Sequence, residues 1–277
     1  MNNLSDIKRR IASVKQTRQI TGAMETISVS KMRKSLETYE SSREYFDMLS
    51  AVACEILSGG VIPEATGAPT VIVIASDKGL CGSFNHDVLR LADAEIADDA
   101  EIVCVGQTVS EHYAGRNNVN RDFVGAVYSP DFVSARRIAD YVYGIFETKN
   151  SPIKIIYTKM VSHAAWQPVS VSLFPPKRDM YAEKSGQKFE FEPSPSEVLE
   201  RFIPLYIGGS IYGAIVSSAA AEHSARRAAM SSSTKNADEM IAALSVEYNR
   251  ARQSKVTEQI TEIIGSTQAL SVQGDKK

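Results

Sequence analysis

The sequence lacks the glycine-rich loops that bind phosphate in nucleotide-binding folds. Neither GxGxxG nor a Gly-Lys dipeptide occurs in its 277 residues, although one or the other opens the helix after the first strand of such domains. The nearest stretch is Gly79-Leu80-Cys81-Gly82. We interpret it as a tight turn in which glycine supplies a positive φ, and we predict no bound cofactor.

Cysteine and histidine are also scarce, which argues against metal and thiol chemistry. The three cysteines, Cys54, Cys81 and Cys104, include no CxxC pair, and we interpret them as reduced intracellular thiols. The four histidines match no metal-ligand spacing. Cys81 belongs to no recognised thiol motif and no serine has a GxSxG context, so we predict no catalytic residue.

Long apolar runs and a leader segment are missing as well. No stretch approaches the ~18 consecutive apolar residues of a membrane span. Met1–Asp6 leads directly into a charged amphipathic run, which predicts no signal peptide. With 43% hydrophobic and 23% charged residues, the composition is that of a soluble protein.

The formal net charge of −2 excludes a globally basic nucleic-acid binder but conceals an uneven distribution. Between Met1 and Ser35 the only acidic residues are Asp6 and Glu25. The basic residues of that stretch are Lys8, Arg9, Arg10, Lys15, Arg18, Lys31, Arg33 and Lys34. The first helix therefore begins with a positive end, whereas residues 70–150 carry an acidic excess.

The C-terminal stretch Ile211–Leu270 contains no proline and follows a helical pattern. Apolar or small residues recur in steps of four and three at Ala237, Ile241, Leu244, Tyr248 and Ala251, as on one side of a helix. A helix of this length spans on the order of 90 Å, which exceeds the diameter of a compact domain. It therefore needs a partner for its apolar stripe. Pro204 and Gly208-Gly209 predict a kink or break before it.

The partner predicted for that helix is a second one over Leu4–Leu57, which begins near Ser5 and ends at Ser58-Gly59-Gly60. Its apolar stripe reads Ile7, Ile11, Val14, Ile20, Met24, Ile27, Met32, Leu36 and Tyr39. Because both stripes follow three–four steps, we expect a left-handed antiparallel coiled coil.

The residues between the helices alternate between strand and helix patterns. We predict strands at 70–75, 101–105, 119–124, 153–157 and 169–173, and helices at 85–96, 108–113 and 131–146. Such alternation indicates a doubly wound, largely parallel sheet. Residues 174–197 form a polar connection with a hairpin edge expected at Lys188–Phe191.

The predicted fold class is therefore α/β: a long antiparallel coiled coil of N- and C-terminal helices with an inserted Rossmann-like α/β domain. The predicted domains are 1–57, 70–197 and 198–277. Two functions suit this layout: a Rossmann-like enzyme with dimerising helical arms and a structural coiled-coil adaptor. The missing phosphate loop disfavours the enzyme.

Four stretches resemble one known family, the γ subunits of F-type ATP synthases. The N-terminal IASVKQTRQITGAMETISVSKMRKS resembles the family's opening helix, and SDKGLCGSFN is similar to its SDRGLCGGFN turn. The stretches AAEHSARRAAMSSSTKNADEMI and EYNRARQSKVTEQITEIIGSTQAL are similar to its C-terminal helix. Residues 105–200 match in layout only.

The resemblance implies the central-stalk rotor of an ion-translocating ATP synthase, a non-catalytic subunit that couples rotation of the membrane c ring to ATP synthesis or hydrolysis. Its coiled coil would turn inside the hexamer of α and β subunits, and its α/β domain would lie against the ε subunit and the c ring. The implied location is peripheral, on the cytoplasmic face of a bacterial cell membrane, with a mature organellar protein as the alternative. Membrane contact would be made only through the c ring.

The resemblance also implies contact residues. Arg252 and Gln253 in NRARQ occupy the positions that hydrogen-bond a loop of one β subunit. Further positions implied in coupling to the β subunit are Met24, Arg226, Thr257 and Glu262. Met24 is also expected in the coil seam, and the two roles are compatible.

A second implied contact is the KFEFEP segment, which matches the segment at the base of the γ subunits in that family. The residues implied to meet ε and the c ring are Phe189, Phe191 and Glu192. Three positions depart from the family pattern: Gly22 stands for its usual lysine, Ser83 for a glycine and Gln259 for a glutamate.

Overall fold

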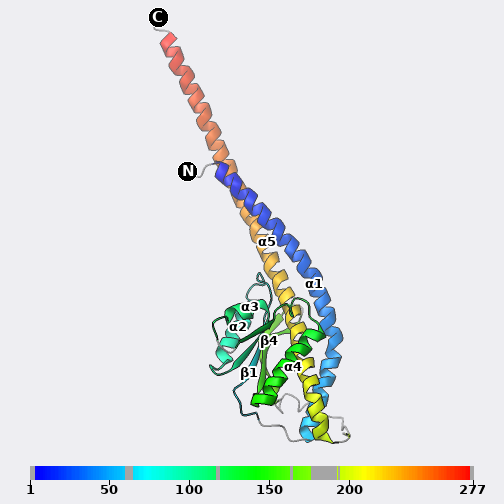
Figure 1. Ribbon diagram of the computed structural model, residues 1–277. Coiled ribbons are helices and arrows are strands. Elements are labelled where there is room, and N and C mark those ends of the chain that lie inside the picture. The colour runs from blue at the N-terminus through cyan, green and yellow to red at the C-terminus, as the bar shows by residue number, and fades with distance from the viewer. Residues whose placement is uncertain are drawn as a thin grey trace. The chain divides into compact units, whose positions relative to one another are not determined.

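The computed structural model describes residues 4–59, 65–116, 119–162, 165–175, 192 and 194–274. Two helices, α1 (Leu4–Gly59) and α5 (Pro195–Gly274), flank all other elements in the chain (Figure 1). Contacts divide the chain into two compact units, Ile27–Ala229 and the pair Met1–Thr26 with Met230–Lys277. Each long helix therefore contributes to both units, and the units are described separately below.

The larger unit contains a five-stranded sheet in the order β3-β2-β1-β4-β5. β1 pairs in parallel with β2 and β4, β2 pairs in parallel with β3, and β5 is antiparallel to β4. The strands are β1 (Thr70–Ile74), β2 (Glu101–Val105), β3 (Val119–Phe123), β4 (Ile153–Ser162) and β5 (Ala165–Phe174). The predicted, largely parallel sheet is confirmed, with β5 as an antiparallel edge.

Helices cover both faces of the sheet, and β1 therefore buries every residue of its TVIVI sequence. Val71 and Val73 face a cluster with α2 (Phe84–Glu95) and α3 (Gln107–His112). Ile72 and Ile74 belong to a second cluster with residues of α4 (Phe132–Lys149) and the beginning of α5. This two-sided burial confirms the doubly wound arrangement.

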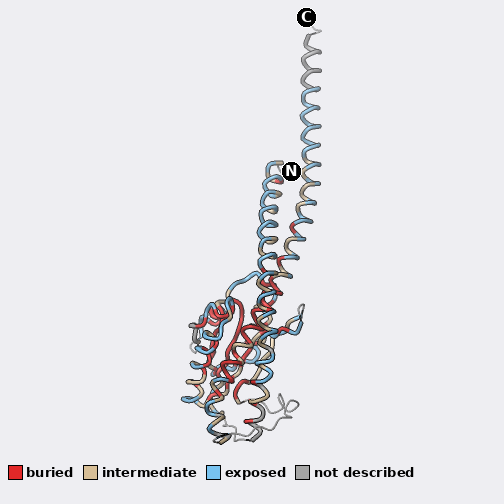
Figure 2. Tube along the Cα trace, turned by 90° about the vertical axis from the view of Figure 1, so that its right-hand side faces the viewer, coloured by how far each residue is buried: buried red, intermediate tan, exposed pale blue. Residues whose placement is uncertain are grey.

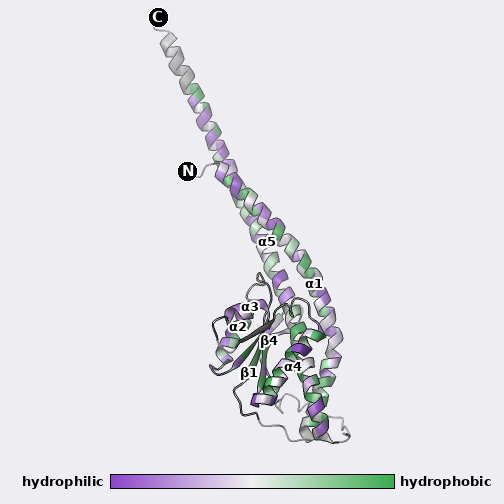
Figure 3. Ribbon diagram, viewed as in Figure 1, coloured by the Kyte–Doolittle hydropathy of each residue, from purple (hydrophilic) through white to green (hydrophobic). Residues whose placement is uncertain are grey.

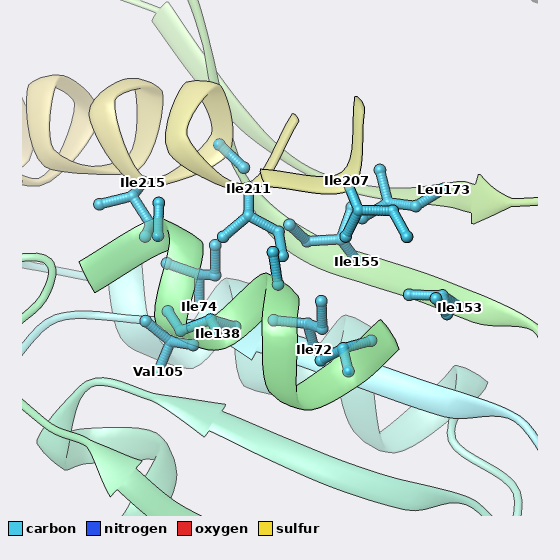
Figure 4. Packing of buried hydrophobic residues seen from close by; sticks show 14 of the residues in the cluster. Ile72, Ile74, Val105, Ile138, Ile153, Ile155, Leu173, Ile207, Ile211 and Ile215 are labelled. Atoms are coloured by element: carbon cyan, nitrogen blue, oxygen red, sulfur yellow. The ribbon is translucent and has the colours of Figure 1, made fainter. Parts of the chain in front are cut away.

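The sequence predicts a kink or a break before Ile211, and because α5 continues through Pro204, a break is wrong. Ile207, Ile211 and Ile215 are fully buried in the cluster that contains α4 and β1, and Figure 4 shows them facing Ile138 and the sheet residues. Burial of a Leu- or Ile-sized side chain contributes roughly 1.5–3 kcal/mol. Three such residues therefore offset the ~3 kcal/mol cost of proline inside a helix.

Gly209, one of the two glycines that follow Pro204, serves the packing of α1 against α5 rather than a break. A Cβ placed on Gly209 would lie 2.4 Å from Leu49 Cδ2 of α1. Leu49 is itself buried. Glycine is therefore needed here for close approach of the helices, whereas its helical conformation is ordinary.

The smaller unit pairs the beginning of α1 with the later part of α5. Arg18 Nε donates to Asp238 Oδ1 at 2.7 Å, and Thr234 Oγ1 lies 2.8 Å from Thr21 Oγ1. The partners run in opposite directions along the two helices, which confirms the antiparallel pairing. Ala237, at 7% exposure, is the most buried residue of the predicted α5 stripe. The other four stripe residues are half-buried.

The predicted α1 stripe is correct in part. Ile20 and Ile27 are 61% and 57% exposed, whereas the polar Ser28 is buried. A straight helix of 3.6 residues per turn drifts from a fixed three–four pattern. The seam therefore reaches Ser28, and small size decides its burial there more than polarity does.

The antiparallel pair at the edge of the sheet is longer than predicted. β4 and β5 extend beyond their predicted bounds into a long antiparallel pair, and the hairpin expected at Lys188–Phe191 lies outside the described residues. By length and composition, Glu200–Ile264 has the character of a membrane span. Because 67% of its most apolar stretch is buried inside the protein, as in the core helix of a soluble protein, this is weak support for a span.

Candidate functional site: the end of α5 and the turn after β1

The C-terminal part of α5 is exposed on all sides. From Arg252 to Ile264 every residue is exposed, and Figure 2 shows this stretch in the colour of exposed residues. The predicted contact residues Arg252, Gln253, Thr257 and Glu262 all lie in it. The stretch presents both polar and apolar side chains, as the mixed colours of Figure 3 show.

Apolar side chains alternate with these polar ones. Val256 and Ile260 are 48% and 52% exposed, and Ile263 and Ile264 are 64% and 55% exposed. Large aliphatic residues gathered in this way are typical of an interaction surface rather than of a solvated helix end. We refer to Arg252–Ile264 as the tip of α5.

Met24 and Arg226 lie elsewhere. Met24 is half-buried on α1 in the smaller unit, which suits the seam position expected for it. Arg226 is buried in the larger unit, and its neighbours are groups of this same chain. Its predicted contact with a β subunit stays a prediction.

Arg226 attaches α5 to the turn after β1. Its Nη1 donates to the carboxylate of Glu222, one helical turn earlier. Its Nη2 donates to the backbone oxygens of Lys78 at 2.9 Å and Gly79 at 3.2 Å. The SDKGLCGSFN motif, which the sequence suggested only as a glycine turn, is thus held against α5 by a buried guanidinium.

Asp77 holds the other side of the same turn. Its Oδ1 accepts from the backbone N–H groups of Gly125 at 2.8 Å and Gln107 at 3.2 Å, and its Oδ2 accepts from Tyr128 N at 3.0 Å. One carboxylate therefore joins the end of β1 to the start of α3 and to the loop before α4. None of these partners is near Asp77 in the sequence, so no local pattern indicates the role of this carboxylate.

Cys81 in this turn is not an activated thiol. It is 2% exposed, and burial raises its pKa, although Ser76 and Arg226 partly oppose that effect. Asn85 Nδ2 lies 3.3 Å from its sulfur. A thiol with a raised pKa is mainly protonated and is a poor nucleophile.

His223 lies beside Arg226 and is buried in its neutral form. Burial, together with the positive charges of Arg226 and Lys31, lowers its pKa to about 4. The pKa of Glu222, on the same helix, is shifted in the opposite direction. Burial raises it, and the charge of Arg226 opposes that rise.

Acidification is expected to destabilise the chain through His223. In the unfolded chain histidine binds a proton near pH 6.5, whereas folded His223 does so only near pH 4. Between those values the unfolded state binds more protons, so stability falls as the pH falls, by about 3 kcal/mol for this residue. Urea denaturation at a series of pH values will measure the slope. His223→Gln should flatten it, and an unchanged slope would show that other groups cause the loss.

The remaining site predictions gain little from the structure. Phe189 and Phe191 lie outside the described residues, and Glu192 is an exposed residue at a bend. Within the described ranges, no group of three or more His, Cys, Asp or Glu side chains is placed to hold a metal ion.

These features define a class of protein: an α/β domain inserted between two long helices that pair antiparallel, with an exposed tip on the second helix. The profile of the ATP synthase family matches residues 3–270. The chain is 35% identical to the ATP synthase gamma chain of Ruminiclostridium cellulolyticum, with 97% of this chain and 99% of that protein covered. It therefore belongs to the ATP synthase gamma chain family.

Other relatives agree in length as well as in sequence. The ATP synthase gamma chain, sodium ion specific, of Acetobacterium woodii is 34% identical, with 97% of this chain and 99% of that protein covered. A chain in the structure of the Euglena gracilis mitochondrial ATP synthase, OSCP/F1/c-ring, rotational state 3, shares the fold. Its TM-score is 0.74 at 17% identity, and 99% of this chain and 96% of that chain are covered.

Proposed function

We propose that the chain is the central-stalk rotor subunit of an ion-translocating F-type ATP synthase. It couples rotation of the membrane c ring to ATP synthesis or hydrolysis in the hexamer of α and β subunits. The observation that carries the proposal is family membership over nearly the whole length of both this chain and its relatives. The exposed tip of α5 supports it, because a rotor needs a surface that its surroundings can contact.

In this role the chain is a non-catalytic subunit. Its partners are the α and β subunits, the ε subunit and the c ring, and it reaches the membrane only through the c ring. Its location is peripheral, on the cytoplasmic face of the bacterial cell membrane. A Rossmann-like enzyme is not favoured, because the turn after β1 lacks a phosphate loop and holds Arg226 instead.

In the proposed mechanism the apolar and the polar side chains of the tip of α5 have different roles, and Arg226 has a third. Apolar side chains of the tip, such as Val256 and Ile260, give the helix a bearing contact that does not depend on direction. Long polar side chains, such as Arg252 and Gln253, make directional hydrogen bonds that break and form again at each angle. The attachment of Arg226 to Lys78 and Gly79 ties α5 to the α/β domain, so that a turn of that domain reaches the helix.

Assembly is the first test. Expressed with its α and β subunits, the chain should co-purify in one complex with ATPase activity. A stable chain that never joins such a complex would contradict the proposal.

Arg252→Ala and Gln253→Ala should lower coupled ATP synthesis about tenfold without preventing assembly. A hydrogen bond to a charged group contributes roughly 1.5–3 kcal/mol, and a loss of ~1.4 kcal/mol in the limiting state is a tenfold change in rate. ATP synthesis and hydrolysis rates of the assembled complex measure the effect. Arg250→Ala is the matched control, because Arg250 is an exposed arginine on the same helix.

The control variant should retain rates within about twofold of the unmodified complex, since the resemblance gives Arg250 no contact. Equal losses in Arg250→Ala and Arg252→Ala would indicate a general charge effect. Unchanged rates in both Arg252→Ala and Gln253→Ala would remove these residues from the coupling surface.

A further inference from the structure

A pocket of about 260 Å³ lies in the larger unit between α1, the loop before α4 and α5. Lys31, Lys34 and Thr38 of α1 line one side. Tyr128 and Ser129 of the loop line another, and His223 and Val216 of α5 also line it. The family resemblance assigns no role to this pocket, and the proposal below does not depend on the proposed rotor function.

The pocket carries positive charge that carboxylates do not neutralise. Lys31 Nζ lies 3.5 Å from the centroid of the Tyr128 ring, and Lys78 Nζ lies 4.3 Å from it. Among the described residues neither Lys31 nor Lys34 forms an ion pair with a carboxylate. Lys31 and Lys34 both line the pocket, and ammonium groups without a carboxylate partner would stabilise an anion placed in it.

Two acidic groups of the larger unit, Glu222 and Asp77, are already engaged. Glu222 is paired with Arg226, and the carboxylate of Asp77 accepts three backbone N–H groups. The pKa of Tyr128 is lowered, chiefly by a hydrogen bond and the charge of Lys31. This shift agrees with a positive local potential but is secondary to the geometry.

The wall of the pocket is fixed before any ligand arrives. Asp77 holds Tyr128 N and Gly125 N, and thereby anchors the loop that carries Tyr128 and Ser129. His223 is buried, and a neutral imidazole offers one N–H donor. Lysine ammonium groups with hydroxyl and imidazole donors are a usual set for phosphate oxygens.

We propose that this pocket binds a compact phosphate-type oxyanion, either inorganic phosphate or the phosphoryl end of a larger phosphate compound. Its volume is below the ~300–1,000 Å³ of sites that enclose drug-sized ligands, so the pocket suits the oxyanion rather than a whole nucleotide. Lys31 and Lys34 supply the charge, and Ser129 and His223 supply neutral donors. A bound anion would join α1, the loop and α5, and so stiffen the α/β domain around α5.

Calorimetric titration of the full chain with inorganic phosphate, at constant ionic strength, tests the proposal. Saturable binding of one phosphate per chain is expected. Lys34→Gln should weaken binding about tenfold, because a charged hydrogen bond is lost. Arg33→Gln is the matched control: Arg33 is the adjacent exposed cation on α1 but does not line the pocket.

The outcomes are distinct. A tenfold loss in Lys34→Gln with less than a twofold change in Arg33→Gln supports the site. Absence of saturable binding, or equal losses in both variants, overturns it. Ser129→Ala gives a second, charge-neutral check and should weaken binding by a smaller factor without altering the thermal unfolding of the free chain.

Two further titrants identify the source of the anion. If pyrophosphate or ATP displaces phosphate and binds with higher affinity than phosphate, the pocket is assigned to the phosphoryl end of a larger compound. If both bind with lower affinity than phosphate, the pocket is assigned to free phosphate. Acetate that displaces phosphate at equal concentration would overturn the phosphate assignment, because the pocket would then be a general carboxylate site.

Discussion

Gly106→Ala is expected to lower the free energy of unfolding of the chain by about 3–5 kcal/mol. Gly106 directly follows β2 with φ +106, and a Cβ at this position would lie 2.2 Å from the backbone oxygen of Ala75. Strain from such a φ costs roughly 1–3 kcal/mol, and overpacking costs a similar amount. The clash cannot be relieved by a side-chain rotation, because the opposing atom belongs to the backbone after β1.

The same substitution should disturb the turn that carries Asp77. Gln107, which follows Gly106, donates its N–H to Asp77, and Gly106 N donates to Phe123 O at 3.3 Å. A shift of the backbone here weakens the links between β1, α3 and the end of β3. The effect is therefore expected in the coupling of the assembled enzyme as well as in stability.

Gly144→Ala is the matched control. Gly144 lies inside α4, and an added Cβ meets nothing within 4 Å. Because glycine in a helix interior is roughly 0.5–1 kcal/mol less favourable than alanine, this variant should be slightly stabilised. Urea denaturation of both variants gives the comparison. A loss below about 1 kcal/mol for Gly106→Ala would show that the backbone after β1 can shift without cost.

Most of the elements could be predicted because their signals are local. The TVIVI and EIVCV runs are buried strands almost as bounded from the sequence, and the first long helix begins at Leu4 as expected. Hydrophobic periodicity and glycine at helix ends act over a few residues, so one sequence suffices to recognise them. The antiparallel pairing followed from two stripes of similar period.

Features that depend on tertiary packing were not predictable in the same way. Gly209 reads as a helix breaker in the sequence, but it is required by the approach of Leu49, 160 positions earlier in the chain. Ile20 fits a three–four stripe and is nevertheless exposed. Local propensity gives way here to the packing of distant segments.

The candidate sites also divide into those with a local sequence signal and those that depend on tertiary packing. Arg252 and Gln253 were found through a motif, and their exposure agrees with a contact role that remains a prediction. Glu222 is one helical turn from Arg226, but the backbone partners of Asp77 and Arg226 could not be found, because they are separated from these residues by up to 51 and 148 positions. Only the folded chain brings them together, and no spacing rule marks them.

Arg226→Met is expected to destabilise the isolated chain by about 3–5 kcal/mol. The side chain of Glu222 is 2% exposed and that of Arg226 is 10% exposed, so removal of the cation leaves a buried carboxylate without its partner. The carbonyls of Lys78 and Gly79 also lose their shared donor. If Arg226 served only to contact a β subunit, the isolated chain would keep its stability, and urea denaturation distinguishes the two.

The pH dependence and a second substitution make this test specific. Burial already raises the pKa of Glu222, and the charge of Arg226 opposes that rise, so Arg226→Met should raise the pKa further. A carboxyl whose folded-state pKa is raised stabilises the fold while it is protonated and loses that contribution as the pH rises. The variant should therefore lie closer to the unmodified chain near about pH 5 than near about pH 8. Adding Glu222→Gln removes the unpaired charge and should restore roughly half of the lost stability. No recovery in the double variant would show that the hydrogen bonds to Lys78 and Gly79, rather than the ion pair, account for the stabilising effect of Arg226.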